Sequence, residues 1–288
     1  MKIETVLSGF VPEPRGRDGL TLARLLAGQS GARLQVAYVK APAWPAPGPA
    51  RAEAGAWAAF LDEQAEATLA QARELAGEDA DLLTYTQRGS GRGLVELARK
   101  RGADVVVIGS APRGRRGRIS LGSTADQLLH SSPVPVLLAP RGYADDVPPA
   151  LTRLTVAYRR GPGADETVKA AARIAAALDL PLRLVTLVMA TYRRHPLGGE
   201  MMAGMREQAM MDLTAAARGP RRRHQVDLEV LEGRTVGAAM RMGDWERSEL
   251  IICASSSAGP LRRVFLGDTS IKIVRAATCP VMILTRQP

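Results

Sequence analysis

The sequence is poor in cysteine, aromatic residues and lysine. Two cysteines in 288 residues are too few for a disulfide framework. Aromatic residues make up 4% of the chain, which leaves few rings on which single-stranded nucleic acid could stack. Only five of the 39 basic residues are lysine, so arginine carries most of the net charge of +10. Beside abundant alanine and glycine, this bias is explained more simply by a GC-rich genome than by a nucleic-acid surface, and we expect no nucleic-acid partner.

From the sequence we also expect neither a membrane-spanning helix nor a signal peptide. No uncharged apolar stretch approaches the roughly 18 residues that a membrane helix needs. The first residues, Met1 to Glu4, are not a basic segment followed by a long apolar one, as a signal peptide would be. A composition of 46% apolar and 24% charged residues is typical of a globular protein. We therefore expect a cytoplasmic protein without contact with a membrane, long enough for two domains.

The chain repeats itself at a spacing of 145 residues. An apolar run that ends in a small residue, a Leu-Gly pair and a Pro-Val pair each occur twice at this spacing. The matching segments are 105–109 and 250–254, 121–122 and 266–267, and 135–136 and 280–281. Upstream, residues 5–9 parallel residues 154–158. Glycine, aspartate and proline cluster between Arg141 and Pro149, as in a linker. We therefore predict two copies of one domain, residues 1–145 and 149–288.

Each copy alternates predicted strands with predicted helices. In the first copy the strands are 3–9, 34–39, 82–86, 105–109 and 135–139, and the helices are 17–29, 52–77, 91–101 and 121–131. In the second copy the strands are 153–158, 182–188, 226–231, 249–254 and 280–284, and the helices are 164–179, 202–218, 235–242 and 267–277. Short apolar strands separated by helices predict a parallel sheet that is covered on both faces. With right-handed crossovers, each copy is a doubly wound, five-stranded α/β domain, whose ligands bind outside the carboxyl ends of the strands.

The loop after the fourth predicted strand is the most informative segment. Residues 109–124 run from the carboxyl end of that strand to the start of a helix, and their glycines let the backbone approach a ligand closely. Ser123 and Thr124 place hydroxyls beside the free amides at the helix start. The positive end of the helix and the arginines of the loop favour an anion, and a phosphate is the natural one. These arginines are Arg113, Arg115, Arg116 and Arg118.

The same loop resembles the ATP-binding signature of the universal stress protein family, which reads Gly, two residues, Gly, nine residues, Gly, then Ser or Thr. Gly109 stands at the first position, and Gly122 and Ser123 stand at the end in register. Residues 128–138 resemble the closing helix and strand of the family. Because both halves share the pattern, the whole chain resembles a tandem universal stress protein.

The resemblance implies two domains of the adenine nucleotide alpha hydrolase-like fold and a role in stress adaptation. It implies ATP or a related adenine nucleotide as ligand, with Mg²⁺ as a candidate companion ion. The nucleotide would be a regulator, and no catalysis beyond its slow hydrolysis is expected. In this family the last strands of two domains pair. Here 136–139 and 281–284 would pair within one chain and give an internal pseudo-dimer, with further self-association and a protein partner left open.

The nucleotide site implied by the resemblance lies in the first copy. The loop and the helix start would meet the phosphates, and residues at two strand ends would wall the adenine side. The residues carried over are Phe10, Val11, Val39, Gly109, Ser110, Arg113, Gly114, Gly122, Ser123 and Thr124. We expect no metal ligands, because the three histidines have no metal-ligand spacing with cysteines or carboxylates. We also expect no disulfide, since Cys253 and Cys279 fall at opposite ends of neighbouring strands.

Several positions depart from the family pattern. Pro112 stands where the second glycine would be, and proline removes one amide donor. Val11 and Arg159 stand near the place of the carboxylate that ends the first strand in the family. The second copy has Ala254, Ser257 and Asp268 at its motif positions, and a carboxylate repels a phosphate. We therefore expect the second copy to be a structural or regulatory half.

The departures leave three alternatives open. The first is a nucleotide-free module of the same fold that regulates a protein partner. The second is a basic protein that contacts nucleic acid through its arginines, with affinity that falls steeply with salt. The third is an enzyme that hydrolyses a nucleotide or transfers an adenylate on this fold.

Overall fold

The computed structural model describes residues 2–43, 51–190, 198–222, 225–254 and 267–285. The first half contains β1 (Thr5–Gly9), α1 (Pro14–Ser30), β2 (Arg33–Lys40), α2 (Arg51–Ala76), β3 (Asp81–Thr86), α3 (Ser90–Arg101), β4 (Val105–Gly109), α4 (Ser123–Ser131) and β5 (Val136–Ala139). The second half contains β6 (Arg153–Ala157), α5 (Ala164–Ala177), β7 (Leu182–Met189), α6 (Gly198–Ala217), β8 (Val226–Gly233), α7 (Val236–Met240), β9 (Glu249–Ala254), α8 (Asp268–Ala276) and β10 (Val281–Leu284). Every predicted strand and helix is present.

Local sequence explains where the helices begin and end. α1 begins at Pro14, whose fixed φ suits the first turn of a helix. It ends at Gly31, which adopts the left-handed conformation with φ of 68°. α3 ends in the same way at Gly102, with φ of 61°. The strands β4 and β9 are nearly continuous apolar runs, as expected for parallel strands that are buried on both faces.

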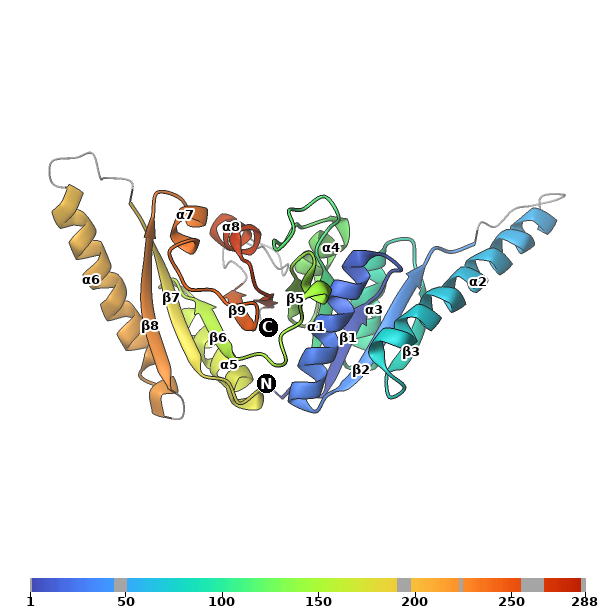
Figure 1. Cartoon of the computed structure of the whole chain (residues 1–288), viewed down its shortest axis with the longest axis horizontal. Coiled ribbons are helices and arrows are strands. Elements are labelled where there is room, and N and C mark those ends of the chain that lie inside the picture. Colours follow the sequence, from blue (N-terminus) through green and yellow to red (C-terminus); the bar gives the residue numbers. More distant parts are fainter. Residues whose placement is uncertain (1, 44–50, 191–197, 223–224, 255–266, 286–288) are drawn as a thin grey trace.

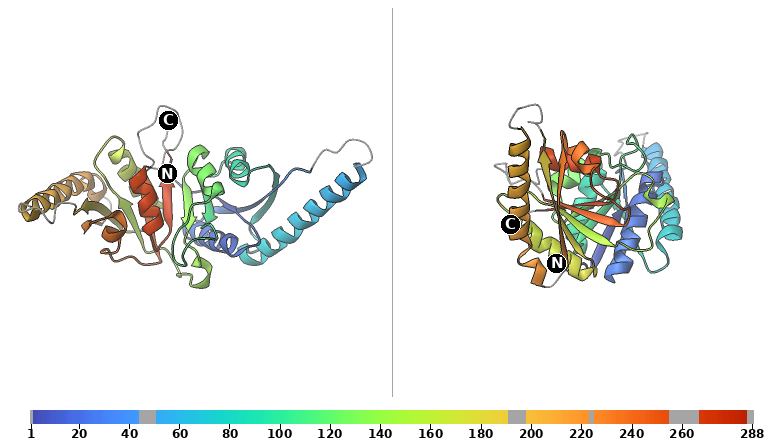
Figure 2. Two further views of the ribbon diagram at one scale, coloured as in Figure 1. Left: turned by 90° about the horizontal axis from the view of Figure 1, so that it is seen from above. Right: turned by 60° about the vertical axis from the view of Figure 1, so that its left-hand side comes forward.

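The strands form one ten-stranded sheet in the order β3-β2-β1-β4-β5-β10-β9-β6-β7-β8. Within each half all pairs are parallel, whereas β5 and β10 pair antiparallel, with Leu137 opposite Met282. The predicted pairing of the last strands is therefore confirmed, and the two doubly wound halves form an internal pseudo-dimer (Figure 1). α2 and α6 lie at the two far ends of the molecule in both views (Figures 1 and 2).

The register of the repeat differs by one residue from the sequence comparison at the first strand. β1 pairs Val6 with Val105, and β6 pairs Leu154 with Leu250. The counterpart of residues 5–9 is therefore 153–157, not 154–158. Both segments are short apolar runs with no residue that fixes the alignment, so the sequence alone does not distinguish the two registers. In the corrected register Val11 and Arg159 are counterparts.

Helices cover both faces of the sheet and bury two large cores. One core lies between the sheet and α1, α2, α5 and α6, and it contains Phe10, Leu22 and Ile174. The other lies on the opposite face, under α3, α4, α7 and α8, and it contains Leu94, Leu128 and Ile273. Both cores run across the two halves, so the halves share a continuous interior.

The segment between the halves is held tightly. The backbone amides of Gly142 and Ala144 donate to the buried Asp18 carboxylate of α1, at 2.8 and 2.9 Å. Tyr143 is fully buried, and the Arg247 guanidinium of the second half lies 5.5 Å from the centre of its ring. The segment that was expected to be a linker is thus part of the packed structure.

Candidate functional site

The candidate site lies where the strand order reverses in the first half. β1 is followed along the chain by β2 on one side, while β4 pairs with its other side. The loops after β1 and β4 therefore leave the same edge of the sheet in opposite directions. In open α/β sheets this is the position at which ligands bind.

Gly109 ends β4 under the first turn of α1. A Cβ atom at Gly109 would lie 1.9 Å from the Arg15 carbonyl oxygen, and one at Gly19 would lie 2.7 Å from the Gly109 nitrogen. The close approach of α1 to β4 therefore requires glycine at both positions. The first glycine of the motif has a packing role in this chain, independent of any ligand.

The loop after β4 is folded upon itself. The Ser120 amide donates to Ser110 Oγ at 2.8 Å, and the Ala111 amide donates to the Ser120 carbonyl at 2.9 Å. Ser110 is buried, so its hydroxyl closes the loop from inside. Gly114 is needed for this closure, because a Cβ atom there would lie 2.7 Å from Ser120 Cβ.

Two of the four loop arginines have partners within the protein. Arg116 forms an ion pair with Asp145 at 2.6 Å, and Arg118 donates to the Ala276 carbonyl at the end of α8. The other two, Arg113 and Arg115, are exposed and have no side-chain partner among the described residues. These two guanidinium groups remain available to an anion.

Arg141 also belongs to the loop, although nothing in the sequence marks it. Its guanidinium donates to the Gly114 carbonyl at 2.6 Å. Its backbone accepts from the Gly117 amide at 2.8 Å and donates to the Arg118 carbonyl at 3.0 Å. The arginine loop (residues 110–120) is therefore held by the segment between the halves and by α8 of the second half.

The start of α4 offers free backbone donors next to this loop. Gly122 precedes the helix in an extended conformation, and none of the described side chains caps the helix. Within the described part of the chain, the amides of Ser123, Thr124 and Ala125 donate no hydrogen bond. Ser123 is exposed and Thr124 is half-buried. Unpaired amides at the positive end of a helix are suited to an anion such as phosphate.

The residues expected on the nucleoside side do not form one wall. Phe10 is 2% exposed and packs in the core under α1, whereas Val39 packs on the opposite face of the sheet. Val39 is covered by α3, because a Cβ atom at Gly93 would lie 2.7 Å from Val39 Cγ1. Of the three, Val11 lies in the loop at the edge itself and is half-buried.

The nearest carboxylate after Val11 in that loop is Glu13. It forms an ion pair with Arg15 at 2.9 Å, and both side chains belong to the start of α1. The loop after β1 thus presents no unpaired carboxylate toward a ribose. The side of the site that would hold a nucleoside is less developed than the phosphate side.

The corresponding edge of the second half is only partly described. Arg159 follows Tyr158 and is exposed, and Arg160 forms an ion pair with Asp212 of α6 at 2.7 Å. Asp268 opens α8 and pairs with Lys272 one turn later. Residues 255–266, including Ser257 of the expected motif, lie outside the described residues.

The described residues lack the side-chain groupings that hold a metal. No three His, Cys, Asp or Glu side chains gather there as a metal site would require. Both cysteines are buried and free, and burial raises the pKa of the Cys253 thiol to about 12. In the same part of the chain, no helix has the length and apolarity to cross a membrane.

Comparisons with known proteins agree with this architecture. The model of the universal stress protein family matches twice, at residues 9–140 and 151–285. A universal stress protein of Mycobacterium tuberculosis and one of Mycobacterium bovis are each 31% identical over 294 residues, covering 97% of this chain and 99% of theirs.

Solved structures show the same fold at lower identity. A universal stress protein of Archaeoglobus fulgidus superposes with a TM-score of 0.67 at 19% identity, covering 100% of both chains. One described as a putative universal stress protein, from Pseudomonas aeruginosa, gives a TM-score of 0.60 at 16% identity, covering 98% of this chain and 93% of its own. Given the double family match and relatives that align over nearly the full length, this chain belongs to the universal stress protein family and carries two such domains in tandem.

Proposed function

We propose that the first half, in the cytoplasm, binds ATP or a related adenine nucleotide as a regulatory ligand in stress adaptation. The observation that carries the proposal is the start of α4, where three free backbone amides lie next to Gly122. Arg113 and Arg115 add positive charge, and neither side chain has a partner among the residues that the structure describes. A phosphate chain would bind there through the amides and be neutralised by the two arginines.

The phosphates supply more of the proposed recognition than the base does. Neither Val11 nor the ion-paired Glu13 offers a free carboxylate to a ribose. Phe10 and Val39 pack on opposite faces of the sheet and do not form a wall for the base. A site that recognises mainly phosphates distinguishes weakly between bases, since each base-specific hydrogen bond that is missing removes selectivity. We therefore expect ATP and GTP to bind with affinities within about tenfold of each other. No protein ligand set for Mg²⁺ is proposed.

The second half is proposed to act as a structural and regulatory partner of this site. It opens α8 with a carboxylate, Asp268, where a phosphate would otherwise lie. It also contributes the Ala276 carbonyl that binds Arg118 of the arginine loop. Its role would be to hold that loop in shape.

The test is a calorimetric titration of ATP into the ligand-free protein and into two variants of one position. Gly122→Asp places a carboxylate at the helix start, and Gly122→Asn places a neutral amide of the same shape there. Both residues cap helices well, and Gly122 has a negative φ, so both variants should fold. We expect one ATP per chain for the wild type and a loss of at least about tenfold in affinity for Gly122→Asp relative to Gly122→Asn, because a like charge at close range costs over 1 kcal/mol.

A second candidate function is a nucleotide-free module that regulates a protein partner. Pro112 and the internal bonds of Arg116 and Arg118 favour it, since they withdraw donors from the loop. Absence of heat at millimolar ATP, with circular dichroism showing folded protein, would support this second function and contradict the first.

A further inference from the structure

α2 and α6 are equivalent helices, and each carries an exposed apolar face. α2 follows β2 and α6 follows β7, which pair with equivalent strands β1 and β6. The two helices, and with them the two exposed faces, therefore lie at opposite ends of the molecule (Figure 2). Because they are at opposite ends, the two faces of one chain cannot cover each other.

The face on α2 is aromatic. Between residues 53 and 64 of this helix no residue is buried, whereas its later turns bury Ala65, Thr68 and Ala72. Trp57 is 49% exposed and Phe60 is 44% exposed, and their rings stack with centroids 5.3 Å apart. We call this surface the aromatic ridge; it comprises Glu53, Ala56, Trp57 and Phe60.

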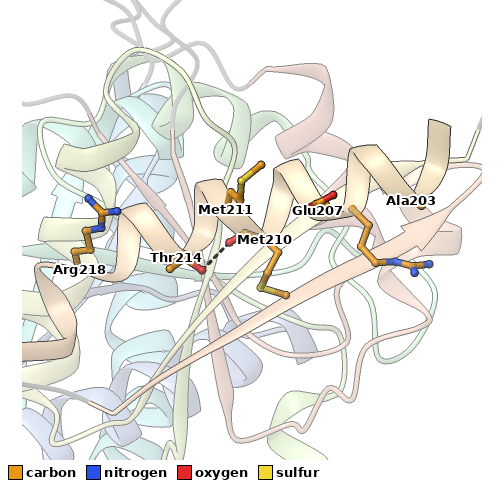
Figure 3. Close-up of a pocket in the computed structure, with 7 residues that line it drawn as sticks. Ala203, Glu207, Met210, Met211, Thr214 and Arg218 are labelled. Carbon is orange, nitrogen blue, oxygen red and sulfur yellow. Dashed lines mark hydrogen bonds between the residues drawn. The ribbon is translucent and has the colours of Figure 1, made fainter. Parts of the chain in front are cut away.

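The face on α6 is lined by methionine. Met210 is 38% exposed and Met211 is 52% exposed, and they lie beside a groove of about 550 Å³. Arg218 lies at one end of the row and Ala203 at the other (Figure 3). We call this surface the methionine groove; its lining is Ala203, Arg206, Glu207, Met210, Met211, Thr214 and Arg218.

We propose that the aromatic ridge of one chain docks in the methionine groove of a second copy of this chain. The two surfaces are chemically complementary, because thioether sulfur contacts aromatic rings favourably and methionine adapts to irregular shapes. The ridge has a single charge, the carboxylate of Glu53. Of the two arginines of the groove, Arg206 is paired with Glu232, and Arg218 has no side-chain partner among the described residues.

The spacing along the two helices also matches. Glu53 and Phe60 are seven residues apart, as are Arg218 and Met211, a rise of about 10.5 Å in either helix. With the helices antiparallel, Glu53 meets Arg218 when Phe60 meets Met211. The same register places exposed Gln64 against Glu207, the one carboxylate of the groove, to which an amide can donate. No two like charges are opposed in this arrangement.

A lipid surface fits the ridge less well than a second copy does. Residues 52–72 contain neither lysine nor arginine, whereas helices that lie on membranes carry basic residues on their polar face. Because the ridge and the groove are different surfaces, their contact is head-to-tail and produces a chain of molecules or a closed ring. The small patch predicts weak association, at roughly tens to hundreds of micromolar.

The test is analytical ultracentrifugation of the full chain over this concentration range with three variants. The ridge variant is Trp57→Ala with Phe60→Ala, and the groove variant is Met210→Ala with Met211→Ala. The control is Met242→Ala, which changes an exposed methionine outside the groove. We expect the average mass of the wild type and the control to rise with concentration, and each face variant alone to remain monomeric.

Mixing the ridge variant with the groove variant tests directly whether the two surfaces bind each other. The intact groove of one and the intact ridge of the other should form a one-to-one dimer that grows no further. Exchange of the charged pair, Glu53→Arg with Arg218→Glu, should preserve association, and either single change should weaken it severalfold. A wild type that stays monomeric overturns the proposal. So does a groove variant that self-associates alone, which would indicate ridge-to-ridge contact, or ridge-dependent pelleting with lipid vesicles by a monomeric protein.

Discussion

At the scale of single residues, the two glycines of the motif, Gly109 and Gly122, have different roles. Gly109 is required by packing, because its missing side chain makes room for the Arg15 carbonyl. Gly122 is far less constrained: the nearest atom to a Cβ there is Ala111 Cβ, at 3.1 Å. The family signature therefore combines one position that serves the fold with one that faces the proposed ligand.

This difference predicts a large loss of stability for one alanine substitution and a small change for the other. Gly109→Ala should lower the free energy of unfolding by about 3 kcal/mol, since α1 must move away from β4 to admit a methyl group. Gly122→Ala should change it by less than about 1 kcal/mol. Chemical denaturation followed by circular dichroism measures both. Equal stability of the two variants would show that the close approach of α1 to β4 is not needed.

The buried thiols predict a pH dependence at the same scale. Burial raises the pKa of Cys253 to about 12 and also raises the pKa of Cys279 above its usual range. The folded state therefore keeps these protons when the unfolded chain has lost them, so stability falls as pH rises above about 8.5, at up to about 1.4 kcal/mol per pH unit and thiol. Denaturation at pH 8 and pH 10 should show this loss, and Cys253→Ala with Cys279→Ala should reduce it. If the free energy of unfolding falls equally with pH in the wild type and in the double variant, the two thiols do not cause the loss.

At the scale of elements, the two halves differ most in the helix after their third strand. α3 has 12 residues, whereas α7 has five. On the face that α7 leaves open, a polar cluster fills the space. Arg183 lies 2.7 Å from Glu249 and 2.8 Å from Glu229, and its guanidinium is 4.5 Å from the centre of the Trp245 ring. Together with Trp245, this cluster covers the part of the sheet that α3 covers in the first half.

This cluster predicts a large effect of removing one charge. Glu249 is fully buried and pairs with Arg153 as well as Arg183. Glu249→Leu should destabilise the protein by about 3–5 kcal/mol, because it leaves a guanidinium buried with too few partners. Adding Arg183→Met should recover part of that loss. Thermal and chemical denaturation test this, and a neutral single substitution would show that the pair does not support the second half.

Periodicity predicts the elements but not the contacts between distant segments. The alternation of apolar strands and amphipathic helices identified α3 and β4 almost to the residue. The shape of the arginine loop could not be predicted in this way, because its bonds go to Arg141 and to Ala276, far along the chain. Charged residues inside predicted strands, such as Arg183 and Glu249, were the available sign of the polar cluster.

At the scale of the whole molecule, the halves are joined by more than a linker. The β5–β10 pair makes one sheet, and both cores cross the junction. Gln29 of α1 also donates to the carbonyls of Leu151 and Leu178, at 3.0 and 3.1 Å. The nucleotide site proposed for the first half therefore rests on contacts made by the second half, which gives the second half a structural role.

This continuity predicts unfolding in a single cooperative transition. Scanning calorimetry should give one peak, with the calorimetric enthalpy equal to the van't Hoff enthalpy. Saturating ATP should move the whole peak to higher temperature, because it binds only the folded state. Two resolved peaks, with only one of them sensitive to ATP, would show that the halves are independent.

Hydrogen exchange with and without ATP tests whether the start of α4 binds an anion. We expect slower exchange at the amides of Ser123, Thr124 and Ala125 and in the arginine loop. We expect little direct protection at the start of α8, residues 268–271, where Asp268 opposes a phosphate. Unchanged exchange at the start of α4 with saturating ATP, or protection at α8 alone, would contradict it.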